Sequence, residues 1–174
     1  TDSTGEYPDA TGVTGATYSG FTFSTSAQQE LPSDIDYSPS NNTVFVAGVF
    51  NSFVHEYTLA GVYTGFSINT NTTAQNPNGV AFDETNSLIW VSSATNTAIH
   101  SYNTAGTATG FNFAVPNNPS GIDWHNGIIY VNDGTTDSIV AYNTAGTATG
   151  FSFTQTQGSA TGQNGVSFNG TDFW

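Results

Sequence analysis

A unit of 40 to 45 residues recurs along this 174-residue chain, and it constrains the fold more than any other feature. The ten residues Tyr102–Phe111 (YNTAGTATGF) are repeated identically at Tyr142–Phe151, 40 residues later. A looser copy, Tyr57–Phe66 (YTLAGVYTGF), lies 45 residues before the first, and Gly15–Phe23 (GATYSGFTF) is a fourth trace. Repeats of this length are typical of proteins built from stacked supersecondary units.

The first half of the unit repeats as well. It reads LPSDIDY, NPNGVAF, NPSGIDW and QNGVSF in four copies, which begin at Leu31, Asn76, Asn118 and Gln163. From the aromatic residue that ends each segment, the next aligned aromatic follows after eight residues in two copies and after six in the other two. Spacing that is fixed inside the unit and varies at one turn indicates a supersecondary repeat.

Each unit is predicted to form four short strands. In the third copy these are Gly121–Trp124, Ile128–Asn132, Ser138–Asn143 and Thr147–Phe153. The first two are joined by an Asn-Gly pair, which supplies the positive φ angles that tight hairpins need. Thr, Asn and Gly are abundant and helix-forming stretches are absent, which favours an all-β fold. Four strands in 40 to 45 residues match the length of a propeller blade.

We therefore predict an all-β fold, a single β-propeller domain over residues 1–174 with about four blades. The complete units are residues 31–70, 76–115 and 118–155, and one blade is split between residues 163–174 and residues 15–23. Three explanations of the split remain open: a closed ring, a polymer in which one subunit's N-terminal strand completes the next subunit's blade, or a piece of a larger propeller. Its third strand is missing unless residues 1–13 provide it.

Pro119–Gly146 (PSGIDWHNGIIYVNDGTTDSIVAYNTAG) resembles a blade of the NHL/YVTN/SMP-30-like group of β-propellers. Those blades share a Pro-x-Gly opening, an Asn-Gly or Asp-Gly turn, an aromatic-Val strand and an Asp-rich turn. The resemblance covers Leu31–Trp174, and weakly Gly15–Phe23, and it implies the architecture. It implies little about activity, because the group includes enzymes, binding modules and scaffolds. The metal set of its lactonases and the His/Glu pair of its lyases find no match here, so we expect a protein that is not an enzyme.

The chain contains no Lys and no Arg beside 13 acidic residues. Binding of nucleic acid or of anionic membranes needs basic side chains, so neither is expected. Cys is absent, which excludes disulfides and thiolate sites. Met is absent too, including a start Met, so we expect a processed product or a part of a longer chain.

Asp36 and Asp123 share one position on the predicted first strand, which lines the axial channel of a propeller. Two interpretations remain: the carboxylates are ligands of a Ca²⁺ ion, completed by carbonyls and water, or they only make the channel polar. No other cofactor is expected. His55 and His100 share a position that is Val140 in the third copy, which favours packing between blades.

Three N-glycosylation sequons begin at Asn41, Asn71 and Asn169, on predicted turns. They agree with an extracellular location or one on a cell or virion surface. The leading hypothesis is a structural subunit of a surface fibre, filament or virion appendage that self-associates by strand complementation, with Phe21, Phe23, Phe173 and Trp174 as assembly residues. The alternative is a glycan-binding or adhesion module, and the third hypothesis is a lactonase-like or lyase-like enzyme.

Overall fold

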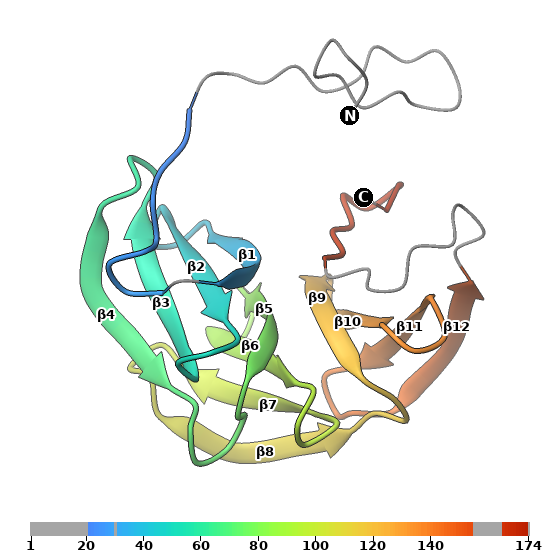
Figure 1. Cartoon of the computed structure of the whole chain (residues 1–174). Helices are drawn as coiled ribbons and strands as arrows, with labels where there is room; N and C mark the ends of the chain where they lie inside the picture. Colours follow the sequence, from blue (N-terminus) through green and yellow to red (C-terminus); the bar gives the residue numbers. More distant parts are fainter. Residues whose placement is uncertain (1–20, 30, 155–164, 174) are drawn as a thin grey trace, which may run out of the picture.

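The computed structural model describes residues 21–29, 31–154 and 165–173. Within these ranges the chain forms twelve strands and no helix, so the predicted all-β class is confirmed. The strands make three antiparallel sheets of four, and each sheet is one complete copy of the repeat. Figure 1 shows the three sheets set as blades around a common centre, with one side of the ring open.

In each blade the strands follow chain order from the centre to the periphery. Blade 1 contains β1 (Pro32–Ser38), β2 (Thr43–Gly48), β3 (Phe53–Thr58) and β4 (Tyr63–Asn69). Blade 2 contains β5 (Pro77–Asp83), β6 (Leu88–Ser93), β7 (Ala98–Asn103) and β8 (Ala108–Ala114). Blade 3 contains β9 (Pro119–His125), β10 (Ile128–Asp133), β11 (Ser138–Asn143) and β12 (Ala148–Thr154). The ends predicted for the strands of the third copy differ from these by at most two residues.

The hairpin between β9 and β10 has the geometry that its sequence predicts. Asn126 and Gly127 have φ angles of 49° and 82°, and His125 pairs with Ile128 across the turn. An Asn-Gly pair adopts these left-handed conformations at little cost, which allows a two-residue turn.

One aromatic pair is repeated inside every blade, between the second strand and the fourth. The rings lie nearly perpendicular, with centroids 6.0 to 6.3 Å apart, in the pairs Phe45–Phe66, Trp90–Phe111 and Tyr130–Phe151. Edge-to-face packing at this distance is favourable beyond the area it buries. The fixed spacing of aromatics in the sequence therefore reflects a fixed contact in the fold.

A second repeated contact joins neighbouring blades. Phe113 of β8 packs against Tyr142 of β11, with ring centroids 5.3 Å apart. It also covers Gly146, where an added Cβ would lie 2.5 Å from the Phe113 Cβ, so only glycine fits there. The outer strand of one blade packs closely on the Ala-Gly-Thr turn of the next blade. This packing explains why the turn and the outer strand after it recur together in the sequence.

Phe23 makes the same contact on blade 1, although it precedes the first strand. Its ring lies 5.4 Å from that of Tyr57, and a Cβ at Gly61 would lie 2.2 Å from its own Cβ. Phe23 thus takes the place of a residue on the outer strand of a preceding blade. The predicted N-terminal strand is described only at residues 21–23, which form no strand and pack through side chains; residues 15–20 lie outside the described ranges.

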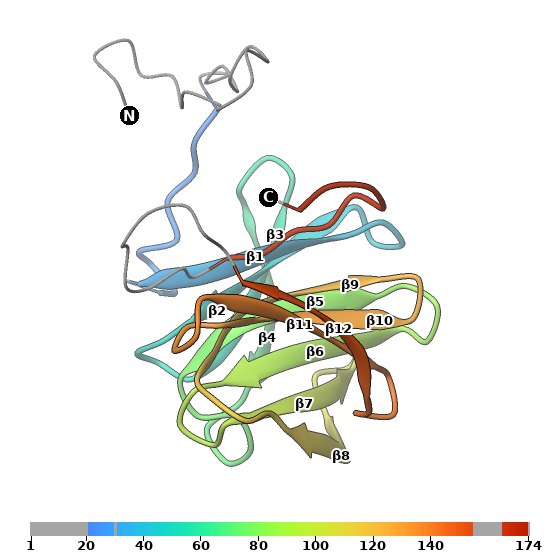
Figure 2. The same cartoon turned by 90° about the vertical axis from the view of Figure 1, so that its right-hand side faces the viewer.

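The C-terminal segment packs on blade 3, on the open side of the ring (Figures 1 and 2). Phe168 and Phe173 form an isolated β-bridge, and their rings lie 4.9 and 5.0 Å from that of Tyr130. Phe173 also contacts Phe153 of β12 at 5.1 Å. The segment therefore takes the place of the inner strands of a following blade, and Trp174 lies outside the described residues.

Candidate functional site

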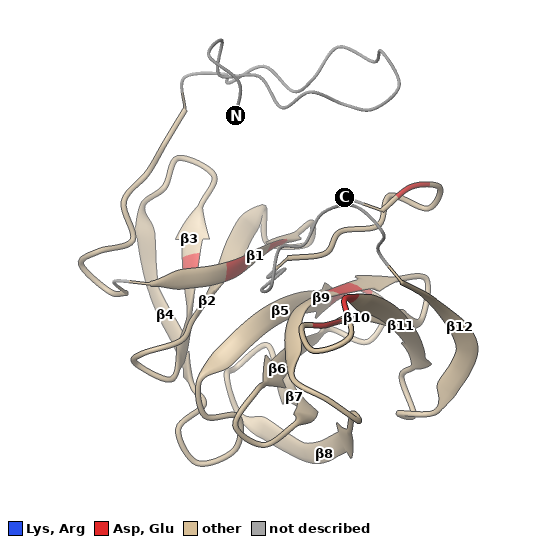
Figure 3. Ribbon diagram, turned by 45° about the vertical axis from the view of Figure 1, so that its right-hand side comes forward, with Lys and Arg blue, Asp and Glu red and all other residues tan. Residues whose placement is uncertain are grey.

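The inner strands β1, β5 and β9 converge on the axis, and β1 and β9 carry acidic residues there. Figure 3 shows acidic positions on β1 and around β9 and β10, close to the centre. Three of them, Asp34, Asp36 and Asp123, bond to backbone N–H groups of other blades. Because these strands are neighbours in space and far apart in sequence, the carboxylates tie the blades together.

Asp36 and Asp123 make equivalent bonds one blade apart. The Oδ2 atom of Asp36 accepts the backbone N–H of Phe82 at 2.6 Å, and that of Asp123 accepts the N–H of Phe168 at 2.6 Å. In blade 2 the same position is Ala81, which has no acceptor. The structure therefore places both predicted residues at the axis, each as an acceptor for the next blade.

Asp34 is a third axial carboxylate, which sequence reasoning missed. Its Oδ2 atom accepts the N–H of Val80 at 3.1 Å and the N–H of Ile122 at 3.3 Å, so one side chain bridges β5 and β9. The other copies have Gly79, Gly121 and Gly165 at this position. The sequence could have revealed Asp34, because one copy of the repeat has Asp where the other three have Gly.

Burial dominates the electrostatics of these carboxylates. Desolvation raises the pKa of Asp34 from 3.8 to about 8 and that of Asp36 to about 7, although backbone hydrogen bonds oppose the shift. The charge of Asp123 adds to the rise at Asp36, and burial also raises the pKa of Asp123 itself. The chain has no Lys or Arg that would stabilise the ionised forms, and the electrostatic interaction with His125 only partly offsets the rise at Asp123.

Among the described residues, no group of three or more His, Asp or Glu is arranged to hold a metal ion. Asp36 and Asp123 lie close enough to interact electrostatically, but each Oδ2 atom already accepts a backbone N–H. Calcium binding at this pair stays a prediction.

One end of the axis opens into a cavity of about 120 Å³, here called the axial mouth. It is lined by the ends of β1, β5 and β9 and by the turns that follow them, with Asp36, Tyr37, Pro39, Phe82, Glu84, Trp124, His125 and Asn126. Each blade contributes an aromatic residue at one repeat position and a different residue two positions later. The mouth thus combines aromatic walls with carboxylate and amide groups.

The face of blade 1 that points to the open side of the ring is apolar and exposed. Ile35 is 54% exposed and Tyr37 is 44% exposed. The residues equivalent to Ile35 in the other copies are almost fully buried: Val80, Ile122 and Val166, at 0%, 2% and 6%. A cavity of about 320 Å³ beside Ile35 is lined by Phe23, Pro32 and Val46 and also by the polar residues Thr25, Ser33 and Asp34.

The other predicted residues are placed as follows. His55 is buried, with Nδ1 2.7 Å from Ser67 Oγ, and burial lowers the pKa of both His55 and His100. The three sequon asparagines are exposed: Asn41, Asn71 and Asn169. The Asn169 Oδ1 atom accepts two backbone N–H groups of its own turn, from Thr171 and Asp172.

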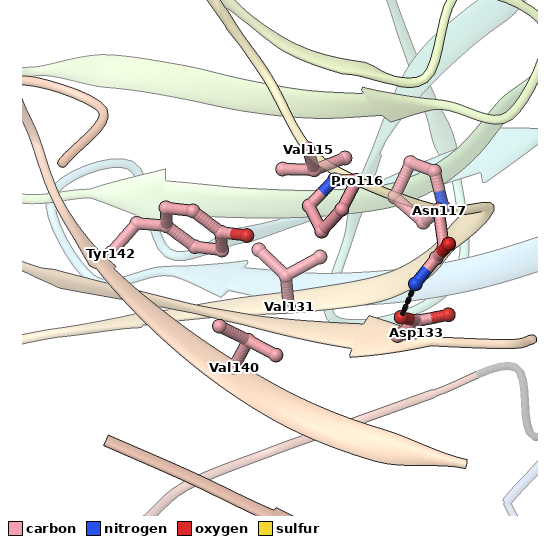
Figure 4. Close-up of a pocket in the computed structure, with 8 residues that line it drawn as sticks. Val115, Pro116, Asn117, Val131, Asp133, Val140 and Tyr142 are labelled. Carbon is pink, nitrogen blue, oxygen red and sulfur yellow. Dashed lines mark hydrogen bonds between the residues drawn. The ribbon is translucent and has the colours of Figure 1, made fainter. Parts of the chain in front are cut away.

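The seam between blades 2 and 3 holds a further cavity of only about 10 Å³ (Figure 4). Val131, Val140 and Tyr142 fill it from blade 3, and Asn117 Nδ2 donates to Asp133 Oδ2 at its edge. Partial burial favours a higher pKa for Asp133, but the bonds from Asn117 and from the turn outweigh it and lower that pKa. A space of this size holds one water at most, so it is a packing seam.

No protein-family model matches the sequence, and no curated protein matches it either. Solved structures match at the level of the fold. The chain is similar to virginiamycin B lyase from Staphylococcus aureus, with a TM-score of 0.61 and 20% identity over 82% of this chain and 47% of that one. It is also similar to a chain of a nidogen/laminin complex, with a TM-score of 0.60 and 16% identity over 74% and 49%.

The WD40 repeats of RRP9 match with a TM-score of 0.57 and 12% identity, over 74% of this chain and 40% of that one. These matches support a β-propeller repeat fold. At such identities they show the fold alone, and the chain spans less than half the length of each of these three proteins. One of these neighbours is named as a lyase, and the nidogen/laminin complex is named without an enzymatic activity. The shared fold therefore does not show whether this chain is an enzyme.

Proposed function

We propose that this protein is a structural subunit that assembles with further copies of itself through its incomplete blade, as in a surface fibre or filament. The observation that carries the proposal is the exposure of Ile35 on blade 1. The equivalent residues of the other copies are almost fully buried, and Val80 and Ile122 pack in core clusters that also contain residues of the blade before them. Exposed apolar faces of this kind mark interaction sites.

The two ends of the described chain offer complementary halves of one blade. Phe23 lies where an outer strand would lie, on Tyr57 and Gly61 of blade 1. Phe168 and Phe173 lie where inner strands would lie, on Tyr130 of blade 3. In the proposed assembly, the C-terminal half-blade of one copy covers Ile35 of the next and meets that copy's N-terminal segment.

Repetition supports a second copy as the occupant. Inside the chain, each blade packs on the next at two seams, and a contact of Phe113 with Tyr142 and Gly146 joins blades 2 and 3. The two ends of the chain carry the same kinds of side chains as these seams. Contact between two copies would therefore repeat a contact that neighbouring blades already form within one chain. A surface location belongs to this proposal, and the exposed sequon asparagines agree with it.

The test is the oligomeric state of the chain, measured by sedimentation velocity over a range of concentrations. We expect self-association that strengthens with concentration and that Ile35→Asp abolishes, because the variant puts a charge on the covered face. Val62→Asp is the matched control, since Val62 is an exposed apolar residue in the β3–β4 turn.

Circular dichroism of both variants checks that they remain folded. A chain that stays monomeric at every concentration contradicts the proposal, and so does equal loss of association in the two variants. A strictly monomeric chain whose stability falls on Ile35→Asp would show instead that another part of the same chain covers the face.

A further inference from the structure

The third strand of each complete blade (β3, β7 and β11) packs on both neighbouring blades through two of its residues. One is a tyrosine, and the other is a Val or Ile three residues before it. The tyrosines are almost fully buried, and so are the aliphatic residues: Tyr57, Tyr102 and Tyr142, and Val54, Ile99 and Ile139. The residues described for the split blade, 21–29 and 165–173, form no such strand.

The aliphatic residue packs on the inner strand of the following blade. Val54 of β3 lies in one core cluster with Val80 of β5, and Ile99 of β7 lies in another with Ile122 of β9. Ile35 is the counterpart of Val80 and Ile122, but it is exposed and belongs to neither cluster. A third strand in the split blade would therefore have one of its two contacts at Ile35.

The tyrosine packs on the outer strand of the preceding blade. Between blades 2 and 3, Tyr142 lies 5.3 Å from Phe113, ring centroid to ring centroid, and Phe113 is 9% exposed. Phe153 of β12 is the counterpart of Phe113 and is only half-buried. Phe173 covers part of its ring from the second-strand side, at 5.1 Å. The remaining surface of Phe153 corresponds to the place that a tyrosine takes in the other seams.

The sequence before Phe23 contains a tyrosine in the matching order. In each blade the third strand comes just before the outer strand, so a third strand of the split blade is expected before Phe23. Glu6-Tyr7 repeats Glu56-Tyr57, and Tyr18–Phe21 (YSGF) follows it as Tyr63–Phe66 (YTGF) follows Tyr57, with a connection five residues longer. Residues 1–20 lie outside the described ranges, so this match is one of sequence alone.

We propose that Tyr7 of one copy packs on Phe153 of another copy, in the place that Tyr142 takes on Phe113 within one chain. The inference rests on the assembly proposed above and names the segment that completes the shared blade. A second copy is the occupant because Ile35 and Phe153 both keep exposed surface in the single chain. Thr4, three residues before Tyr7, would lie on Ile35 of its own copy, and Thr is β-branched like Val and Ile and favours strands.

The experiment places the photo-crosslinking residue p-benzoylphenylalanine at position 153, where it keeps an aromatic ring, and irradiates the full chain at concentrations at which it associates. Denaturing gels separate the products, and mass spectrometry after Glu-C digestion locates the cross-links, because the chain has no Lys or Arg for trypsin. We expect cross-links between two copies that map to residues 1–13. The same label at Phe113 is the positive control, since it should react within one chain near Tyr142. A label at the exposed Val62 is the negative control.

Three variants of the segment test the role of Tyr7. Tyr7→Ala should lower the yield of these cross-links about tenfold and weaken association in sedimentation velocity about tenfold, because a few buried aromatic residues carry most of the binding energy of an interface. Tyr7→Phe keeps the ring and should restore both. Ser3→Ala is the matched control, because Ser3 belongs to the same segment and lies outside Thr4–Tyr7.

The outcomes separate this inference from the assembly itself. Cross-links from position 153 to residues 1–13 of the same copy would overturn the second copy as the occupant, and a chain that is also monomeric would contradict the assembly. Cross-links that map only to other segments would overturn the inference, and so would a Tyr7→Ala chain that associates as tightly as the unmodified one. If Ile35→Asp still abolishes association in that case, the assembly stands and Tyr7 is not its anchor.

Discussion

The buried axial carboxylate of Asp36 should make this protein less stable as the pH rises, and Asp36→Asn should remove part of that effect. In the folded chain the pKa of Asp36 is raised from 3.8 to about 7, mainly by burial. The folded state therefore holds a proton that the unfolded state has lost. Stability from this group is fully present below about pH 4 and is lost as the pH rises through about 7.

The magnitude follows from the shift. About three pKa units at about 1.4 kcal/mol each give an upper limit of about 4 kcal/mol. Asp36 is only partly buried by its exposed area, so solvent screening reduces this figure, and we expect about 2 kcal/mol. Asn is isosteric but keeps one acceptor where Asp36 uses two, for Tyr37 and Phe82, which costs about 1 kcal/mol at every pH.

The assay is urea denaturation at about pH 5 and about pH 8, followed by tryptophan fluorescence, with midpoints converted to free energies of unfolding. Relative to the unmodified chain, Asp36→Asn should gain about 1 kcal/mol between these two pH values, because part of the loss already occurs between about pH 4 and about pH 5. Asp172→Asn, at an exposed position, separates the effect of the buried site from that of removing one of 13 negative charges. A difference between Asp36→Asn and the unmodified chain that does not change with pH would refute the reasoning.

Two further substitutions test the contacts between blades. Asp123→Ser, which installs the residue found at Ser167 in the last copy, should remove the acceptor for Phe168 N–H and speed the hydrogen exchange of that amide about tenfold, while the Phe82 amide, held by Asp36, keeps its rate. Equal changes at both amides would contradict this. Gly146→Ala should destabilise the chain by about 1 to 3 kcal/mol more than Gly150→Ala in thermal unfolding, because both residues have positive φ but only the first faces Phe113; equal costs would show that the close approach is unimportant.

The strands and turns were predictable because identical segments were expected to form identical structures. Asn103 and Asn143 each begin an AGT turn, and in both turns the side-chain Oδ1 accepts two backbone N–H groups, from Ala105 and Thr107 or from Ala145 and Thr147. This local bonding depends only on neighbouring residues. The sequence therefore carried enough information to predict it.

The axial site was predictable only in part. Asp36 and Asp123 could be assigned to the channel because first strands line it, but the donors that bond to them are backbone N–H groups 46 and 45 residues away. Asp34 bonds to a residue 88 positions away, and no side-chain pattern encodes a backbone partner. The number of blades depends on the angle between packed sheets, which the repeat alone does not determine. For the same reason the narrower propeller group stays a prediction.

The net charge of the chain leads to a last prediction about the proposed assembly. Each copy has a formal net charge of −13 at pH 7 and has no Lys or Arg, so two copies repel and no Lys or Arg ion pair can form between them. Association must then rest on apolar contact at Ile35 and on strand pairing, against a repulsion that salt screens over about 8 Å at physiological ionic strength. Raising NaCl from about 20 mM to about 500 mM should strengthen self-association in sedimentation velocity. Association that weakens with salt would mean that the copies attract through charges, which this sequence can supply only through His, the N-terminal amine or a bound cation.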